Sequence, residues 1–475
     1  MQWKELLSEK RYRENPSRKK TVKGSDLRSE FEKDYHRIIG SASFRRLQDK
    51  TQVFPLDKSD FIRTRLTHSL EVSSFAKSLG QNIGENILRY HKNTGFLPRM
   101  KDDISNILQC AGLIHDIGNP PFGHFGETAI REWFRRNLGN YSLLGKPIDS
   151  ILTDRMRQDL YHFEGNAQAL RLVSKLHFLV DESGMNLTYA LLNTIIKYPV
   201  SSVEIDPKGN NIKNKKMGYY LADEDIFNEI TKETGTGNLR HPLTFILEAA
   251  DDIAYKTADI EDAVIKGFLT YEKILGELEE MEARFKPPEE SYFIPSRKFA
   301  ELYRVGKERH AGDPQEYAIK NWIVRLQGFL IHCATFGFTN NYDAILNGEY
   351  SKDIFYGTFG EKIMDLLGDL AFREVFCSDA IYKMEVAEGT MLNFLMDRFI
   401  RAAVLYTADD KSMDTLDQRM ISFISGNYKR AYHFHAQGKS EEEKLYLRLL
   451  LVTDYICGMT DSFAKRLYQE LNALI

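Results

Sequence analysis

Apolar residues recur at helical spacing along most of this sequence. In the segment DDISNILQCAGLIHD, Ile104, Ile107 and Leu108 stand at positions i, i+3 and i+4, which places them on one face of an α-helix. The segment THSLEVSSFAKSLGQNI repeats the pattern, whereas the apolar–polar alternation of β-strands is scarce. The stretch NIKNKKMGYYLADED is compatible with a short hairpin or with an ordered loop. The sequence therefore predicts an all-α fold.

The chain length of 475 residues suits two or three domains, or one large helical body. The charge-rich stretch ELEEMEARFKPPEES contains two prolines that end a helix, and we place a boundary there. We predict a basic N-terminal segment over residues 1–33, a catalytic core over 34–275, and a C-terminal helical region over 276–475 that packs on the core.

Charge and cysteine content narrow the class of protein. The net charge is −4, but residues 1–65 hold 17 basic against 10 acidic side chains, which suits either contact with phosphates or a solvated surface. Four dispersed cysteines fit a reducing compartment. The N-terminus lacks the apolar core of a signal peptide, and the longest uncharged run, 326–342, is too short and polar to span a bilayer. We therefore expect a cytoplasmic protein with no membrane segment.

The motif HDIGNPPFGHFGE concentrates groups that can bind a metal. His115 and Asp116 follow an amphipathic helix that Gly118 and two prolines stop, so both side chains stand at an open helix end. His68 and an aspartate of EAADDIAYKTADIEDA, Asp251 or Asp252, are further candidate ligands. Two imidazoles and two carboxylates suit Mn²⁺, Mg²⁺, Fe²⁺ or Zn²⁺ and leave coordination positions for water or phosphate.

The two aspartates differ in the helix face that they occupy. Asp251, Tyr255 and Asp259 are spaced i, i+4 and i+8 and share one face, whereas Asp252 points about 100° away. If Tyr255 faces the site, Asp251 is the ligand. Tyr255 is equally compatible with a place in the apolar core.

His124 and Glu127 form a candidate acid–base pair. They are spaced i and i+3 in GHFGETAIREWF, so they stack if this segment opens a helix. A carboxylate beside an imidazole orients the ring and favours its protonated form, which suits a proton donor or a base that activates water. The alternative is that His124 only caps the helix N-terminus.

Several long motifs occur in order along the chain: RRLQDKTQVFP, RTRLTHSLEV, HDIGNPPFGHFGE, DLYHFEGNAQALRLV, KYP, GYYL, EAADDIAY and YICGMTD. Together they resemble the bacterial deoxyguanosine triphosphate triphosphohydrolases of the HD superfamily. The similarity runs from about residue 34 to the last helix. It is weaker over 210–216 and 280–350.

The resemblance implies an all-α HD fold with additional C-terminal helices. It also implies metal ligation by His68, His115, Asp116 and Asp251. The reaction it implies is attack of water on the α-phosphorus of dGTP, with other deoxynucleoside triphosphates left open as substrates. The products would be a deoxynucleoside and inorganic triphosphate. The absence of a phosphate loop of the GxxxxGKS or GxxxxGKT type agrees with this chemistry.

The same resemblance suggests roles for further residues. His162 is similar to another active-site histidine of the family, although a structural role suits it too. Gln52 is similar to the position that meets the sugar 3′-hydroxyl, and an apolar contact from Val53 would leave a 2′-hydroxyl without a partner, at a cost of about 1–3 kcal/mol. The remaining candidates for substrate contact are Arg65, Lys197, Tyr198, Lys216, Tyr255, Asp259 and Arg419.

Partners are also implied. The resemblance suggests a homo-oligomer, with a hexamer favoured, in which Arg419 reaches a neighbouring site. It also suggests single-stranded DNA as an effector, bound through phosphate contacts and base stacking on Tyr12. The basic residues near the start of the chain are Arg11, Arg13, Arg18, Lys19, Lys20 and Lys23.

Two other readings stay open. The same ligands serve HD phosphohydrolases that act on a nucleoside monophosphate, a cyclic nucleotide or an alarmone. A nucleotide-sensing scaffold with an inactive site is the non-enzyme reading. The motifs GNPPFGHFGE and HFEGNAQ favour the triphosphohydrolases.

Overall fold

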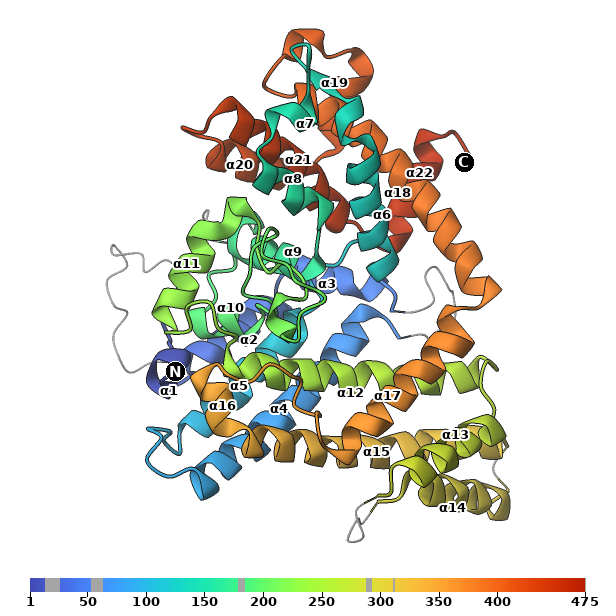
Figure 1. The fold of residues 1–475 in the computed structure, drawn as a ribbon. Helices are drawn as coiled ribbons and strands as arrows, with labels where there is room; N and C mark the ends of the chain where they lie inside the picture. Colours follow the sequence, from blue (N-terminus) through green and yellow to red (C-terminus); the bar gives the residue numbers. More distant parts are fainter. Residues whose placement is uncertain (13–25, 53–62, 178–183, 288–292, 311, 475) are drawn as a thin grey trace. The chain divides into compact units, whose positions relative to one another are not determined.

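The computed structural model describes residues 1–12, 26–52, 63–177, 184–287, 293–310 and 312–474 (Figure 1). Within these residues the chain forms helices α1 to α22. The only sheet among them is a hairpin in which β1 (Ser142–Leu143) pairs antiparallel with β2 (Lys146–Pro147). The prediction of an all-α fold is confirmed. No helix in this part of the chain has the length and hydropathy needed to cross a membrane.

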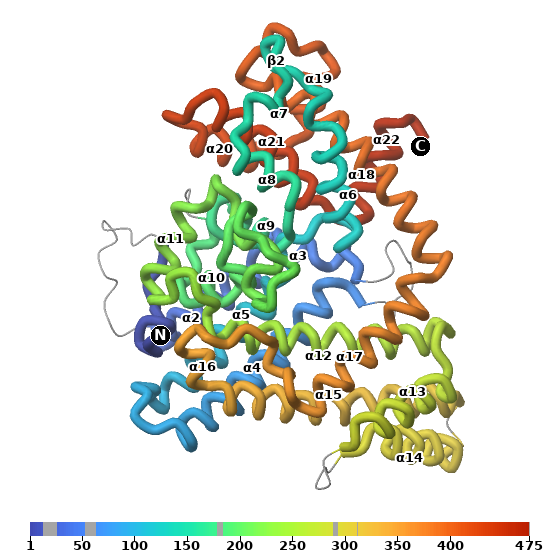
Figure 2. The backbone as a smooth tube through the Cα atoms, in the orientation of Figure 1, coloured from blue at the N-terminus to red at the C-terminus, as the bar shows by residue number. Residues whose placement is uncertain are grey.

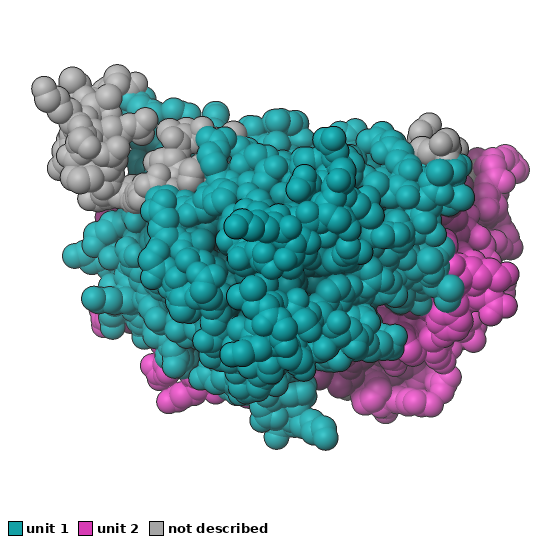
Figure 3. Space-filling view, turned by 90° about the horizontal axis from the view of Figure 1, so that it is seen from above, with its two compact units in different colours: residues 1–69, 113–244, 385–475 teal, residues 70–112, 245–384 magenta. Residues whose placement is uncertain are grey.

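The chain divides into two compact units, which Figure 3 shows in different colours. Unit 1 contains residues 1–69, 113–244 and 385–475, and unit 2 contains residues 70–112 and 245–384. Four helices contribute residues to both units: α4 (Arg65–Tyr90), α5 (Met100–Ile114), α12 (Pro242–Ile265) and α18 (Asp379–Leu405). The three regions expected from the sequence, with boundaries at 33 and 275, stay a prediction.

Unit 1 is built around helix α21 (Glu441–Cys457), in which every residue from Leu445 to Cys457 is buried. Its other helices are α1 (Trp3–Leu6), α2 (Glu30–Ile39), α3 (Ala42–Arg46), α6 (Gly123–Asn137), α7 (Ile148–Ile151), α8 (Asp154–Tyr161), α9 (Gly165–Arg171), α10 (Tyr189–Thr194), α11 (Glu224–Glu233), α19 (Thr415–Phe423), α20 (Gly426–His435) and α22 (Asp461–Leu471). Figure 2 shows that α8, α9 and α20 lie beside α21.

A buried ion pair attaches α9 to α21. The guanidinium of Arg171 donates to both carboxylate oxygens of Asp454 at 2.8 Å, and it also contacts Asp223 at 3.2 Å. Gln168 donates to Asp454 at 2.8 Å. Breaking a buried pair by removing one partner typically costs about 3–5 kcal/mol because it leaves a charge without compensation. The position of α9 is therefore strongly fixed.

Unit 2 consists of long helices. Besides its parts of α4, α5, α12 and α18, it contains α13 (Tyr271–Arg284), α14 (Pro295–Glu308), α15 (Pro314–Asn340), α16 (Tyr342–Asn347) and α17 (Phe359–Ala371). Helices α14 and α15 pack along each other (Figure 1), and the buried indole of Trp322 donates to the carbonyl of Pro295 at 3.0 Å. Asp313 caps α15 by accepting from the amides of Gln315 and Glu316.

Near the N-terminus, Arg11 is engaged within unit 1. Its guanidinium pairs with Glu30 at 2.9 Å and with the buried carboxylate of Asp34 at 2.5 Å, and its side chain is only 10% exposed. Of the basic cluster expected to meet phosphates, Arg11 therefore has a structural role. Arg13, Arg18, Lys19, Lys20 and Lys23 lie outside the described residues.

His241 predicts a pH dependence of stability. It is fully buried, its Nε2 donates to the carbonyl of Leu6 at 3.1 Å, and its Nδ1 accepts from the amide of Leu243 at 3.2 Å. Burial lowers the pKa of His241 from 6.5 to about 4. Because the unfolded chain takes up this proton first, the free energy of unfolding falls as the pH drops from 6.5 towards 4, by at most about 3 kcal/mol for this group.

The measurement is urea unfolding of the wild type and of His241→Gln at several pH values between 4 and 7. The variant should be less stable at pH 7 and should lose less stability over this interval. Parallel curves for the two proteins would contradict the assignment.

Candidate active site

The motif HDIGNPPFGHFGE forms the connection between α5 and α6. Helix α5 ends at Ile114, directly before His115, and α6 begins at Gly123. Phe122 has φ 63° and Gly123 has φ 58°, so the backbone passes through the left-handed region as it enters α6. The turn leaves His115 and Asp116 at the helix end, as the position of Gly118 predicts.

His68 and His115 lie against each other in unit 1. Both are buried, their rings meet edge to face with centroids 5.2 Å apart, and one ring nitrogen of each lies within 4.8 Å of the other. Asp116 Oδ1 is 3.6 Å from His115 Nε2. Two imidazoles and a carboxylate at this separation are a donor set that suits a divalent metal ion. The fourth candidate ligand, Asp251, lies on α12 in unit 2, and Asp252 follows it.

Two neighbours orient Asp116. The guanidinium of Arg65 contacts Oδ2, and the amide of Asn119 donates to Oδ1 at 2.8 Å. Arg65 is itself buried, and a guanidinium nitrogen fills the space beside Gly123. Arg65, a candidate for contact with the triphosphate, therefore also positions a candidate metal ligand.

Two glycines allow the motif to approach α9 closely. A Cβ atom at Gly118 would lie 2.2 Å from the backbone nitrogen of Ala169. A Cβ at Gly165 would lie 2.1 Å from Asn119 Oδ1 and 2.6 Å from Glu127 Oε1. Since real Cβ atoms essentially never come this near, the motif and the start of α9 can pack in this way only with glycine at both positions.

His124 and Glu127 form a contact in the first turns of α6. Nδ1 of His124 lies 3.3 Å from Glu127 Oε2, and the His124 side chain is 73% exposed while that of Glu127 is 3% exposed. Phe122, at the cap position, makes no side-chain cap hydrogen bond. The pair thus presents an accessible imidazole that is backed by a buried carboxylate.

Glu127 is held in its ionised form by its surroundings. Burial alone would raise its pKa, but the hydrogen bond with His124 and the charges of His124, Lys216 and Arg131 lower the pKa below its ordinary value. Glu127 Oε1 also accepts from the amide of Gly165 at 2.8 Å, and Arg131 donates to Oε2 at 3.0 Å. The carboxylate therefore keeps its charge near neutral pH.

Next to this pair, unit 1 contains a cavity of about 550 Å³. His162 lies in its wall, and its Nδ1 donates to the carbonyl of Gln158 at 3.1 Å. Burial and the nearby charges of Arg135 and Arg131 lower the pKa of His162, against the effect of the hydrogen bond with Gln158. The cavity is lined by Thr128, Arg131, Glu132, Arg135, Asp154, Gln158, His162, Glu164, Ser202, Val203, Ile205, Pro207, Lys215, Lys216 and Met217.

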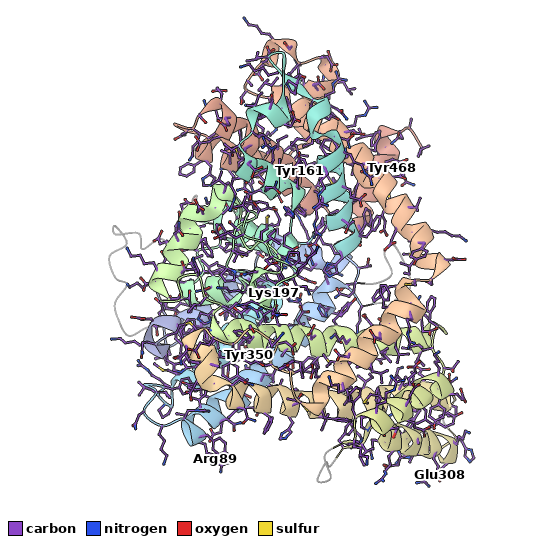
Figure 4. All side chains as sticks on the ribbon, viewed as in Figure 1. Arg89, Tyr161, Lys197, Glu308, Tyr350 and Tyr468 are labelled. Carbon is purple, nitrogen blue, oxygen red and sulfur yellow. The ribbon has the colours of Figure 1, made fainter. Side chains whose placement is uncertain are left out.

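The motifs KYP and GYYL lie side by side. The amide of Gly218 donates to the carbonyl of Val200 at 2.9 Å, and a Cβ at Gly218 would overlap the carbonyl of Tyr198. Arg240 donates to the carbonyl of Lys197 at 2.9 Å. Figure 4 labels Lys197 in this part of unit 1. The segment before Gly218 is an ordered loop with a short 3₁₀ helix over Ile212–Asn214, not a hairpin.

The other candidate substrate residues belong to both units. Gln52 is half-buried in unit 1, and Val53 lies outside the described residues. In unit 2, Tyr255 stacks on Phe376 with ring centroids 6.4 Å apart, and Asp259 is buried. Arg419 is exposed on α19. It is not among the residues that line the cavity.

Two residues that the sequence did not indicate hold the motif in place. The buried Lys50 donates to the carbonyl of Asn119 at 2.5 Å and to that of Cys457 at 2.6 Å, and burial lowers the pKa of Lys50 to about 8. Asp461 accepts from the amide of Phe122 at 2.9 Å and from the amide and hydroxyl of Thr51. Lys50 lies in the motif RRLQDKTQVFP and Asp461 in YICGMTD, but no spacing rule indicates their partners.

Comparison with known proteins defines the class and the family. Residues 65–179 match the HD domain family. A deoxyguanosinetriphosphate triphosphohydrolase-like protein of Listeria innocua is 47% identical over 476 residues, which cover 100% of both chains. Proteins named deoxyguanosinetriphosphate triphosphohydrolase from Serratia proteamaculans and Yersinia pestis are 33% and 32% identical over 94% and 93% of this chain, and 94% of each relative is covered.

The chain is thus an HD-domain hydrolase with a helical fold. More narrowly, it belongs to the deoxyguanosinetriphosphate triphosphohydrolase family, so the resemblance seen in its motifs is confirmed.

The close approach at Gly165 generates a test of the site. Gly165→Ala should push Asn119 and Glu127 out of place and lower hydrolysis by roughly 10²–10⁴-fold, the scale of lost acid–base catalysis. The rate should be measured on protein whose circular dichroism shows an intact fold. Gly276→Ala is the matched control, because Gly276 is exposed on α13 and an added Cβ meets nothing within 4 Å. An unchanged rate for Gly165→Ala would mean that this packing does not support catalysis.

Proposed function

We propose that this protein hydrolyses dGTP to deoxyguanosine and inorganic triphosphate with the help of a divalent metal ion. The observation that carries the proposal is the His124–Glu127 contact at 3.3 Å in the same motif that supplies His115 and Asp116. The relatives named for this activity support it. Other deoxynucleoside triphosphates are proposed as further substrates, and none of these relatives favours a monophosphate, cyclic nucleotide or alarmone.

We assign the metal ligands to His68, His115, Asp116 and Asp251. The donor chemistry of the two imidazoles and Asp116 in unit 1 supports this assignment. Asp251 is preferred over Asp252 by the resemblance of EAADDIAY to the family. Mn²⁺ or Mg²⁺ is the proposed ion, and Fe²⁺ or Zn²⁺ would also fit such ligands. Once bound, the ion would polarise water and offset phosphate charge.

His124 is proposed as the proton donor to the departing 5′-oxygen. The ionised, buried carboxylate of Glu127 attracts the protonated imidazole, and its hydrogen bond to Nδ1 directs Nε2 outward. His162 is proposed as a third group with a different task. Because Nδ1 of His162 donates to Gln158, its Nε2 accepts a proton or a hydrogen bond when the ring is neutral.

Substrate contacts are assigned by charge and by resemblance. Arg65, Lys197, Tyr198 and Lys216 are proposed to meet the triphosphate, since its several negative charges need cationic and hydrogen-bonding partners. Gln52 and Val53 are proposed at the sugar, and Tyr255 and Asp259 on α12 complete the set.

The assembly is also proposed from the resemblance. A homo-oligomer, with a hexamer favoured, would bring the exposed Arg419 of one subunit to the site of another. Single-stranded DNA is proposed as an effector that binds the basic segment before residue 26, and the cytoplasm as the location. The involvement of Arg11 with Glu30 and Asp34 assigns any DNA contact to other residues of that segment.

Product analysis tests the proposed function. The protein should be incubated with each of the four deoxynucleoside triphosphates and Mn²⁺ or Mg²⁺, and the products separated by anion-exchange chromatography. We expect deoxyguanosine and intact triphosphate from dGTP. Release of orthophosphate or pyrophosphate in place of triphosphate would identify a different bond as the one that breaks.

The ligand assignment makes a second prediction. Asp251→Ala should remove both bound metal and activity, whereas Asp252→Ala, the neighbouring control, should retain the metal. Metal content is measured by mass spectrometry of the purified proteins, and activity by release of triphosphate. The reverse pattern would assign the ligand to Asp252.

A further inference from the structure

Glu164 and Lys216 form an ion pair in the wall of the cavity in unit 1. Lys216 Nζ lies 3.0 Å from Glu164 Oε2 and 3.1 Å from Oε1, so both carboxylate oxygens share the ammonium group. Glu164 is 3% exposed, whereas Lys216 is 32% exposed. Both residues line the 550 Å³ cavity. An anion that enters the cavity therefore meets Lys216 already paired.

The groups around Glu164 determine how strongly its carboxylate depends on Lys216. Arg131 donates to Glu164 at 3.3 Å and to Glu127 at 3.0 Å, so one guanidinium serves two buried carboxylates. Asn166 donates to Glu164 Oε1 at 2.7 Å. Burial and the charge of Glu127 raise the pKa of Glu164. Without Lys216, this buried carboxylate would depend on the guanidinium of Arg131, which it shares with Glu127. Opening the ion pair between Glu164 and Lys216 is therefore costly.

We propose that Glu164 is a positioning residue that competes with the phosphates of substrate and product for Lys216. The ion pair opens when a polyphosphate binds and closes again as inorganic triphosphate leaves. The inference rests on the proposed function, because that function supplies the triphosphate. The cost of opening the pair weakens the binding of substrate and product alike, and the carboxylate recaptures Lys216 as the product departs.

Two other carboxylates in the cavity wall show what is special about Glu164. Glu132 pairs with Arg136 at 2.6 Å and is 46% exposed, and Asp154 pairs with Arg157 at 3.4 Å and is 68% exposed. Their charges are screened by water, and they pair with arginines and not with Lys216. Glu164 alone, among the carboxylates that line this cavity, is both buried and bonded to Lys216. Glu164 therefore competes through its ion pair with Lys216, and not through the overall negative charge of the cavity wall.

The experiment measures binding of inorganic triphosphate by isothermal titration calorimetry in one Mg²⁺ buffer. We expect Glu164→Gln to bind it about tenfold more tightly than the wild type, because Lys216 is released and the glutamine keeps the shape of the side chain. Glu132→Gln removes one negative charge from the same cavity and should change the affinity less than twofold. In a Lys216→Met background, Glu164→Gln should have no effect.

Kinetics give a second readout that simple damage would not produce. For Glu164→Gln, both KM and kcat for dGTP should fall, since the substrate binds more tightly and the product leaves more slowly. Weaker triphosphate binding by Glu164→Gln, an equal gain for Glu132→Gln, a gain that persists in Lys216→Met, or no triphosphate binding by the wild type would each overturn the inference. A failure of the proposed function looks different: dGTP is then not hydrolysed to triphosphate, whatever the calorimetry shows.

Discussion

The negative charge on Glu127 is the feature on which the candidate site in unit 1 depends. Burial opposes this charge, and it persists because His124, Arg131, Lys216 and the amide of Gly165 together outweigh burial. Each of these partners places a demand on the fold. The amide can reach Glu127 only if residue 165 has no side chain, and α9 must stay in place, which the buried pair between Arg171 and Asp454 ensures. Glu127 thus connects the motif HDIGNPPFGHFGE with α9, and the Arg171–Asp454 pair connects α9 with α21.

Segments far apart in the sequence bind the connection between α5 and α6. Lys50 bonds to the carbonyls of Asn119 and Cys457, and Asp461 bonds to Thr51 and to the amide of Phe122. Phe122 has left-handed backbone geometry directly before α6, so fixing its amide also fixes the entry into α6. Unit 1 accordingly includes residues from both ends of the chain. Substitutions near Asp461 should therefore affect the site by displacing the connection between α5 and α6, and not by removing a catalytic group.

Local features of the sequence predicted the helices and their ends, but they did not predict ion pairs between residues that are far apart in the sequence. Helical spacing predicted the all-α fold, and Gly118 marked the end of α5, because both depend on neighbours within a few residues. The i, i+3 spacing likewise anticipated the contact between His124 and Glu127. The sharing of Arg131 by Glu127 and Glu164 was not visible, since residue 164 follows a separate helix and no periodicity joins it to α6. Arg11 shows the same limit: a basic cluster suggested phosphate binding, but tertiary packing gives this residue two carboxylates.

His124 and His162 have different environments, which suits different tasks for the two side chains. His124 is exposed, and its Nδ1 lies 3.3 Å from the buried carboxylate of Glu127. His162 is partly buried among Arg131 and Arg135, and its surroundings lower its pKa, which favours a neutral ring. Hydrolysis of a phosphate ester needs a proton donor for the leaving oxygen and benefits from an acceptor nearby, and we propose His124 and His162 for these two tasks. Arg131 acts on neighbours of both histidine sites, because its charge supports the ionised form of Glu127 and opposes a charge on His162. Arg131 therefore connects the carboxylate behind His124 with the imidazole of His162.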